Sequence, residues 1–137
     1  ECEGLMYDVG NQIQSLEMFN LGIPFLNLND ILVVNEKHYF YINSKKIHEI
    51  KNEHIIISEA YKRSPFFSPE LKSIPGKLHW NSAYYSLGSV VTFCLMGEFV
   101  ELNKHRSILD RLYGTKLYWA LDRCLEENTA DRFYLII

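Results

Sequence analysis

Hydrophobic residues in the first part of the chain recur at the spacing of an α-helix. From Leu5 to Leu16 they follow one another at intervals of three or four residues, so that one face would be apolar. This pattern predicts a helix over Leu5–Leu21 that ends at Gly22, since glycine is a common residue just past a helix C-terminus.

Two short β-type runs follow this helix. Ile31–Val34 and Tyr39–Ile42 are rich in β-branched and aromatic residues and flank the polar Asn35-Glu36-Lys37, which predicts a β-hairpin. From Asn43 to Phe67 no period is visible, and this stretch is expected to be a long loop with a short strand at Ile55–Ile57.

The second half of the chain has the patterns of helices. Trp80–Met96 predicts a buried helix, because Ser82–Gly97 contains no charged residue. Three shorter helical patterns follow at Ile108–Tyr113, Leu117–Leu125 and Asp131–Ile137. The expected fold class is therefore mainly α with a small β-hairpin.

Length and composition fit one globular domain over residues 1–137, since 47% of the 137 residues are hydrophobic. The sequence begins at Glu1 without a methionine, and we expect it to be part of a longer polypeptide. The uncharged stretch Ser82–Gly97 is shorter than the roughly 20 residues that a membrane span needs, so no membrane span is predicted.

Charge and cysteine content narrow the function classes. A net charge of −3 argues against nucleic-acid binding, and the small basic cluster Lys45, Lys46 and Lys51 is expected in a solvated loop. The three cysteines are odd in number and far apart, which fits neither a disulfide framework nor a metal site. We therefore expect an intracellular location, cytoplasmic or nuclear, where thiols stay reduced.

Three short motifs stand in a definite order. Ser68-Pro69-Glu70 resembles the Ala-Pro-Glu motif that closes a protein kinase activation segment. Tyr85-Ser86-Leu87-Gly88 resembles the Trp-Ser-Leu-Gly motif that opens the buried central helix of the large lobe, and Arg132 matches an arginine near the end of a kinase domain. The chain thus resembles the eukaryotic-type protein kinase superfamily, over the large, C-terminal lobe.

This resemblance implies a protein kinase-like C-lobe, in an α+β superfamily, with the small lobe absent. It also implies that Glu70 and Arg132 form a partly buried, bidentate ion pair that ties the activation-like segment to the end of the domain. The alternative is that the two are unrelated surface charges.

The catalytic residues of the family are missing from the matching positions. The resemblance puts Phe25 at the position of the catalytic aspartate, and Asp30 and Asn43 at the two metal-ligand positions. Asp30 and Asn43 are weak metal candidates, and Asp30 is otherwise expected to cap a turn. No catalytic residue, metal or cofactor is assigned.

The predicted function is therefore that of a pseudokinase: a catalytically deficient domain that acts as a protein-binding, scaffolding or regulatory module in signalling. Its partner would be another kinase, a substrate or a second copy of the chain. The alternative is a C-lobe fragment of a serine/threonine protein kinase that needs a separate or deleted small lobe for ATP binding and phosphoryl transfer. A third possibility is an unrelated helical domain, in which Glu70 would lie far from Arg132.

Overall fold

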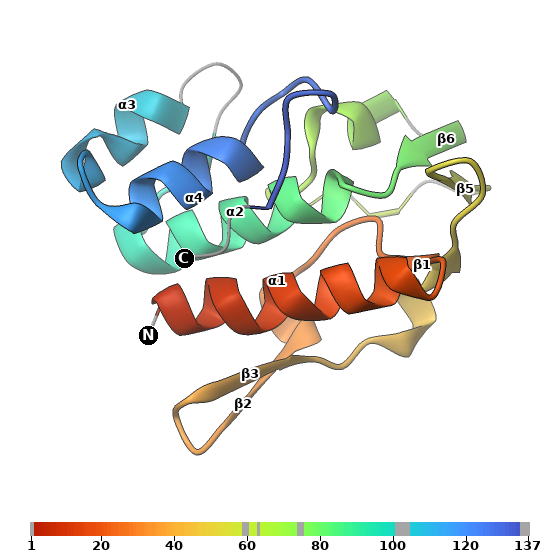
Figure 1. The fold of residues 1–137 in the computed structure, drawn as a ribbon, viewed down its shortest axis with the longest axis horizontal. Helices are drawn as coiled ribbons and strands as arrows, with labels where there is room; N and C mark the ends of the chain where they lie inside the picture. The colour runs from red at the N-terminus through yellow and green to blue at the C-terminus, as the bar shows by residue number, and fades with distance from the viewer. Residues whose placement is uncertain (1, 59–60, 63, 74–75, 101–104, 135–137) are drawn as a thin grey trace.

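The helix α2 (Ser82–Met96) forms the centre of the molecule. In the computed structural model, which describes residues 2–58, 61–62, 64–73, 76–100 and 105–134, α2 lies between α1 (Cys2–Met18) and α4 (Lys116–Cys124) (Figure 1). The short helix α3 (His105–Leu109) packs against α4. Every residue of α2 from Ser82 to Thr92 is buried, which explains why this stretch carries no charge.

The first helix follows the apolar spacing of its sequence. Leu5, Val9 and Ile13 are buried at positions four residues apart and face α2. The helix ends at Met18, earlier than predicted, because the chain then turns through Asn20, whose φ of 59° lies in the left-handed region.

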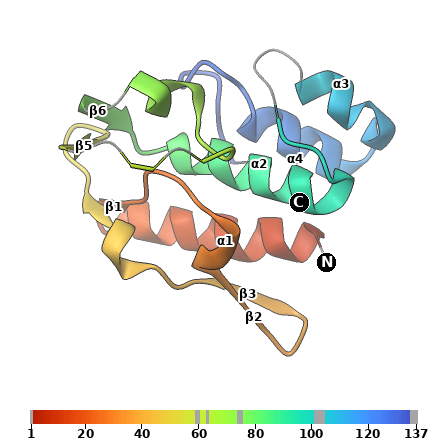
Figure 2. The ribbon, with the colours of Figure 1, turned by 180° about the vertical axis from the view of Figure 1, so that it is seen from behind.

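Among the described residues, six short strands form three separate two-stranded antiparallel sheets. The hairpin of β2 (Ile31–Val34) and β3 (His38–Tyr41) lies along α1, on the side away from α2 (Figures 1 and 2). β1 (Leu21–Gly22) pairs with β4 (His48–Glu49). β5 (His54–Ile57) pairs with β6 (Gly76–His79), at the end of the molecule where α2 begins.

The expected fold class, mainly α with one hairpin in a kinase-like C-lobe, is wrong. The described residues combine four α-helices with three small sheets, which is a mixed α+β arrangement, and nothing in it establishes a kinase fold. The additional strands are short and lie in the stretch without periodicity. Gly22 is not the predicted helix stop but a strand residue, packed closely against Ile50 and Ile55.

The helical predictions in the second half have different outcomes. The buried helix at Trp80–Met96 and the helix at Leu117–Leu125 are confirmed within two residues by α2 and α4. The helix predicted at Asp131–Ile137 is wrong over residues 131–134, which are a turn followed by chain without regular secondary structure; residues 135–137 lie outside the described residues.

In the described part of the chain, two apolar clusters fill the interior. The larger joins α1, α2 and α4. The smaller lies between β5, β6 and the loop before β2, and its buried members are Phe25, Ile55, Ile57, Leu71 and Leu78.

Gly88 allows α2 and α4 to approach closely. A Cβ atom at this position would lie 3.1 Å from Cys124 Cβ and 3.2 Å from Leu125 Cδ2. We expect Gly88→Val to lower the free energy of unfolding in urea by about 2 kcal/mol or more, because the added methyl groups overpack this contact.

The neighbouring residue provides a matched control. Ser89 is fully buried, and within the described part of the chain its hydroxyl has no hydrogen-bond partner. Ser89→Ala should therefore leave stability unchanged or slightly higher. A Gly88→Val variant as stable as the wild type would contradict this account of the interface.

Candidate functional site

The loop Ile23–Asp30 connects β1 to β2 and is held against the central helix. Ile23, Phe25 and Leu26 are buried. The Leu26 N–H donates a hydrogen bond to Ser86 Oγ at 2.7 Å, and the Ser86 hydroxyl donates to the Leu26 carbonyl at 3.1 Å. One buried side chain of α2 thus satisfies both backbone groups of a loop residue and fixes the loop.

Phe25, at the position where the kinase resemblance implies a catalytic aspartate, is a core residue. It is 2% exposed and makes edge-to-face contacts with the rings of Tyr61, at 5.1 Å between centroids, and Phe67, at 4.7 Å. The ammonium of Lys46 lies 3.9 Å from the centroid of the same ring, a cation–π geometry. The Phe25 side chain therefore serves packing.

The Asp30 carboxylate is buried and fully engaged by neighbouring groups. Its Oδ2 accepts hydrogen bonds from Lys46 Nζ at 2.5 Å and from the Asn27 N–H at 3.0 Å. Its Oδ1 accepts one from Asn43 Nδ2 at 2.9 Å. The side chains of Asp30 and Lys46 are only 4% and 12% exposed, so this is an ion pair largely removed from solvent.

The pKa of the Asp30 carboxyl reflects two opposing effects. Burial raises it, but the hydrogen bonds from Lys46, Asn43 and Asn27, together with the Lys46 charge, outweigh burial and leave the pKa below its ordinary value. The carboxylate is therefore ionised at neutral pH, with the Lys46 ammonium as its counter-ion.

Asp30 and Asn43 lie together, as the resemblance implies for two metal-ligand positions, but their contacts do not fit a metal site. Both carboxylate oxygens already accept hydrogen bonds, and the nearest cation is the ammonium of Lys46. The Asn43 Oδ1 accepts from the Lys45 N–H at 3.2 Å. Within the described residues, no group of three or more His, Cys, Asp or Glu side chains could hold a metal ion.

Glu70 and Arg132 are in contact, although 62 residues separate them in the sequence. The Arg132 guanidinium donates to both carboxylate oxygens of Glu70, at 2.6 and 3.1 Å. Its Nε also donates to the Glu126 carbonyl at 2.9 Å, and the Arg132 side chain is fully buried. This bidentate pair connects the helical turn Pro69–Ser73 to the end of the described chain.

The other residues singled out in the sequence line the same region. Ser68 is buried, with its hydroxyl 2.5 Å from that of Ser82, and Pro69 opens the turn that carries Glu70. Tyr85 is buried beneath the Arg132 guanidinium, which lies 5.1 Å from the centroid of its ring. Leu87 belongs to the main core. These residues hold the fold together rather than facing an open cavity.

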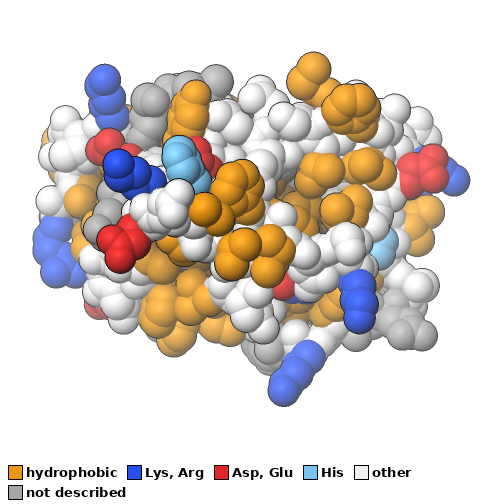
Figure 3. Space-filling model, turned by 90° about the horizontal axis from the view of Figure 1, so that it is seen from below, with side chains coloured by type: hydrophobic (Ala, Val, Ile, Leu, Met, Phe, Trp, Pro, Cys, Tyr) orange, Lys and Arg blue, Asp and Glu red, His pale blue; other side chains and the backbone are white. Residues whose placement is uncertain are grey.

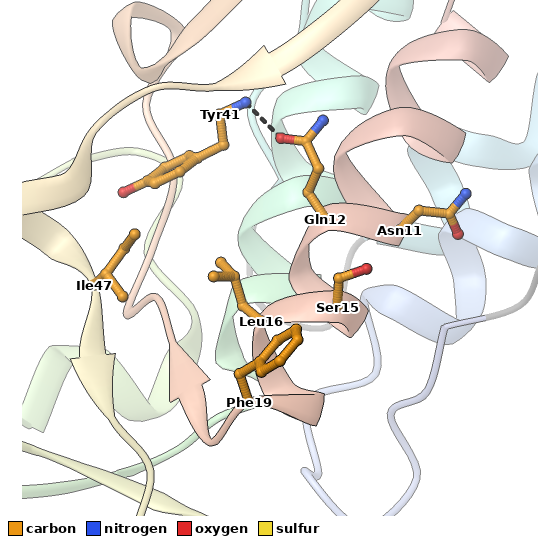
Figure 4. A pocket seen from close by; sticks show the side chains of 7 residues that line it. All are labelled: Asn11, Gln12, Ser15, Leu16, Phe19, Tyr41 and Ile47. Atoms are coloured by element: carbon orange, nitrogen blue, oxygen red, sulfur yellow. Dashed lines mark hydrogen bonds between the residues drawn. The ribbon is translucent and has the colours of Figure 1, made fainter.

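An apolar pocket of about 390 Å³ lies between the end of α1 and the chain that follows β3. Figure 4 shows Leu16 and Phe19 on the α1 side and Ile47 across from them. The seven residues that line it are Asn11, Gln12, Ser15, Leu16, Phe19, Tyr41 and Ile47. The Tyr41 hydroxyl is buried without a hydrogen-bond partner among the described residues, and burial, followed by the charges of Asp30 and Tyr61, raises its pKa.

Sequence reasoning missed Lys46 and this pocket. Lys46 was expected in a solvated loop with Lys45 and Lys51, and this expectation is wrong for Lys46, whose ammonium is buried against Asp30 and Phe25. The sequence signal for its position was its spacing of three residues from Asn43. One turn of 3-10 helix, Ser44–Lys46, brings a residue at this spacing back toward the loop Ile23–Asp30.

No protein-family model matches this sequence, and a search of curated proteins found no match. Among the helices that the structure describes, none has both the length and the apolar character to cross a membrane.

We expect Lys46→Met to lower the free energy of unfolding by roughly 3–5 kcal/mol at neutral pH, because it leaves the Asp30 carboxylate buried without its counter-ion. At pH values above 3.8, the ordinary pKa of Asp, the ion pair stabilises the fold. This contribution is lost as the pH falls below that value and Asp30 takes up a proton. The difference in the free energy of unfolding between Lys46→Met and the wild type should therefore be smaller at about pH 3 than at neutral pH.

Urea unfolding at the two pH values measures both effects. Lys45→Met is the matched control: it removes a neighbouring lysine that is exposed, and should change stability by less than about 0.5 kcal/mol. Equal losses for the two variants, or a loss that does not depend on pH, would contradict the assignment of Lys46 as the counter-ion.

Proposed function

We propose that this chain is a catalytically deficient relative of eukaryotic-type protein kinases that acts as a protein-binding or scaffolding module. The observation that carries the proposal is the ion pair between Asp30 and Lys46, together with the burial of Phe25 under the same lysine. Phosphoryl transfer needs a carboxylate that can orient the substrate hydroxyl and others that can hold Mg²⁺. Here an aromatic ring stands at the first position, and the Asp30 carboxylate is neutralised by Lys46.

The relationship to kinases is supported by contacts between the motifs. The resemblance implies a pair between Glu70 and Arg132, and these side chains are joined by two hydrogen bonds. Ser86, from the second motif, holds the backbone of the loop that would be catalytic. These two contacts carry no chemistry themselves, and they support a relationship to kinases in which the catalytic positions have changed.

A binding role is supported by the apolar surface. Leu32, Phe40 and Ile42 on or next to the β2–β3 hairpin are each about half exposed, and the pocket beside Phe19 lies nearby on α1. Figure 3 shows hydrophobic side chains spread across the face seen from below, between small groups of charged ones. Exposed apolar patches of this kind commonly mark interaction sites.

The proposal places the module inside the cell, in the cytoplasm or nucleus, in a signalling or regulatory role. Cys94 and Cys124 are free thiols, which agrees with a reducing compartment. The proposed partners are proteins rather than nucleic acids, given the net charge of −3.

Thermal unfolding with ATP and either Mg²⁺ or Mn²⁺ tests the catalytic deficiency. We expect no rise in the midpoint up to millimolar nucleotide, because Lys46 already neutralises Asp30. A ligand present at 100 times its dissociation constant would add about 2.7 kcal/mol of stability. A metal-dependent rise that Asp30→Asn abolishes would instead support the kinase fragment that needs a separate small lobe.

A further inference from the structure

Two histidines lie side by side on the β5–β6 sheet. His54 of β5 is paired with His79 of β6, and the centroids of their rings are 5.3 Å apart. The next pair along the ladder is joined by the Trp80 N–H, which donates to the Glu53 carbonyl at 3.1 Å. The His54 N–H turns away and donates to the Lys51 carbonyl at 3.0 Å. His54 and His79 are therefore a non-hydrogen-bonded pair, the kind in which opposite side chains come closest.

The His79 ring is neutral in this arrangement. Its Nδ1 accepts a hydrogen bond of 3.1 Å from the Asn81 N–H, and a proton on this nitrogen would remove the acceptor. The Asn81 side chain in turn donates to the Thr129 carbonyl at 2.9 Å and accepts from Arg132 Nη1 at 3.4 Å. Protonation of His79 therefore acts at the point where β6, the start of α2 and the end of the described chain meet.

Most of the surroundings of His79 oppose a positive charge on its ring. Burial lowers the pKa of His79, the charge of His54 lowers it further, and the charge of Arg132 adds a smaller effect. The Asn81 side chain and the Glu53 carboxylate favour the charged ring but do not outweigh burial and His54. The Glu53 carboxylate lies 3.9 Å from His79 Nε2 and its side chain is 78% exposed, so solvent screens the attraction.

The lowered pKa of His79 sets the direction of the pH dependence. When the sheet opens, the ring becomes exposed and returns to its ordinary pKa of 6.5, so below this pH the open form binds more protons than the closed form. The neutral ring therefore stabilises the closed sheet above pH 6.5. This contribution is lost as the pH falls from 6.5 toward the lowered pKa of the closed form.

The β5–β6 sheet joins the two ends of the segment that carries Ser68 and Glu70. β5 ends at Ile57, β6 begins at Gly76, and these two residues are paired, with residues 58–75 between them in the sequence (Figure 1). The histidine pair lies at the opposite end of the same short ladder. A ladder of four residue pairs has few hydrogen bonds to lose, so a change at one end affects the whole sheet.

We propose that His54 and His79 form a pH switch: at mildly acidic pH their protonated rings repel each other and the β5–β6 sheet opens, which separates the two ends of the segment 58–75. The opening is local, because the bidentate pair of Glu70 with Arg132 still holds this segment to the rest of the molecule. The switch does not depend on the proposed binding function, since it involves only groups within the chain.

Amide hydrogen exchange of the full chain, measured by NMR, tests the proposal. Between about pH 7 and pH 5, the protection factors of the Leu78 and Trp80 amides, corrected for intrinsic exchange, should fall at least about threefold. The amide of Val90, in the buried middle of α2, should keep its protection factor. The same samples report the His79 ring resonances, whose titration midpoint should lie below 6.5.

Three glutamine variants identify the groups responsible. His79→Gln should abolish the fall in protection, because glutamine stays uncharged, and His54→Gln should reduce it and serves if the first variant does not fold. His38→Gln is the matched control: it removes a strand histidine of β3 whose side chain is 63% exposed, and should behave as the wild type does. Unchanged protection of Trp80 at pH 5, an equal fall in His79→Gln, or a fall at Val90 as large as that at Trp80 would overturn the proposal.

Discussion

A buried carboxylate needs hydrogen-bond donors around it, and at Asp30 this requirement brings three separate segments of the chain together. Asn27 from the loop, Asn43 from the end of the hairpin and Lys46 from the following turn all converge on it. The lysine also covers the ring of Phe25, which anchors the smaller core. The negative charge of Asp30 is thus neutralised by a side chain of the protein itself.

The central helix α2 connects this site to the rest of the molecule. Ser86 holds the loop from one side, and Gly88 lets α4 approach from the other. Arg132 joins the turn carrying Glu70 to the end of the described chain through Glu70 and the Glu126 carbonyl. These contacts fix the loop, α2, α4 and the turn carrying Glu70 relative to one another, and such a fixed arrangement agrees with the surface-binding role proposed above.

Local patterns in the sequence were enough to find the elements with strong periodicity. The uncharged stretch that became α2 and the two short β-type runs that became β2–β3 were both visible. The pairings of Leu21 with Glu49 and of Ile57 with Gly76 could not be predicted from local patterns, because strands of two to four residues depend on partners distant in the chain. Lys46 was misjudged for a related reason: its burial depends on Asp30 and Phe25, which precede it by 16 or more residues.

A double-mutant cycle on Asp30 and Lys46 tests the central claim most directly. The free energies of unfolding of the wild type, Asp30→Asn, Lys46→Met and the double variant would be measured in urea at pH 7. If the two side chains form the buried pair described here, the coupling free energy should be at least about 1.5 kcal/mol, with the double variant more stable than the Lys46→Met variant. Additive losses, with a coupling below about 0.5 kcal/mol, would contradict the account.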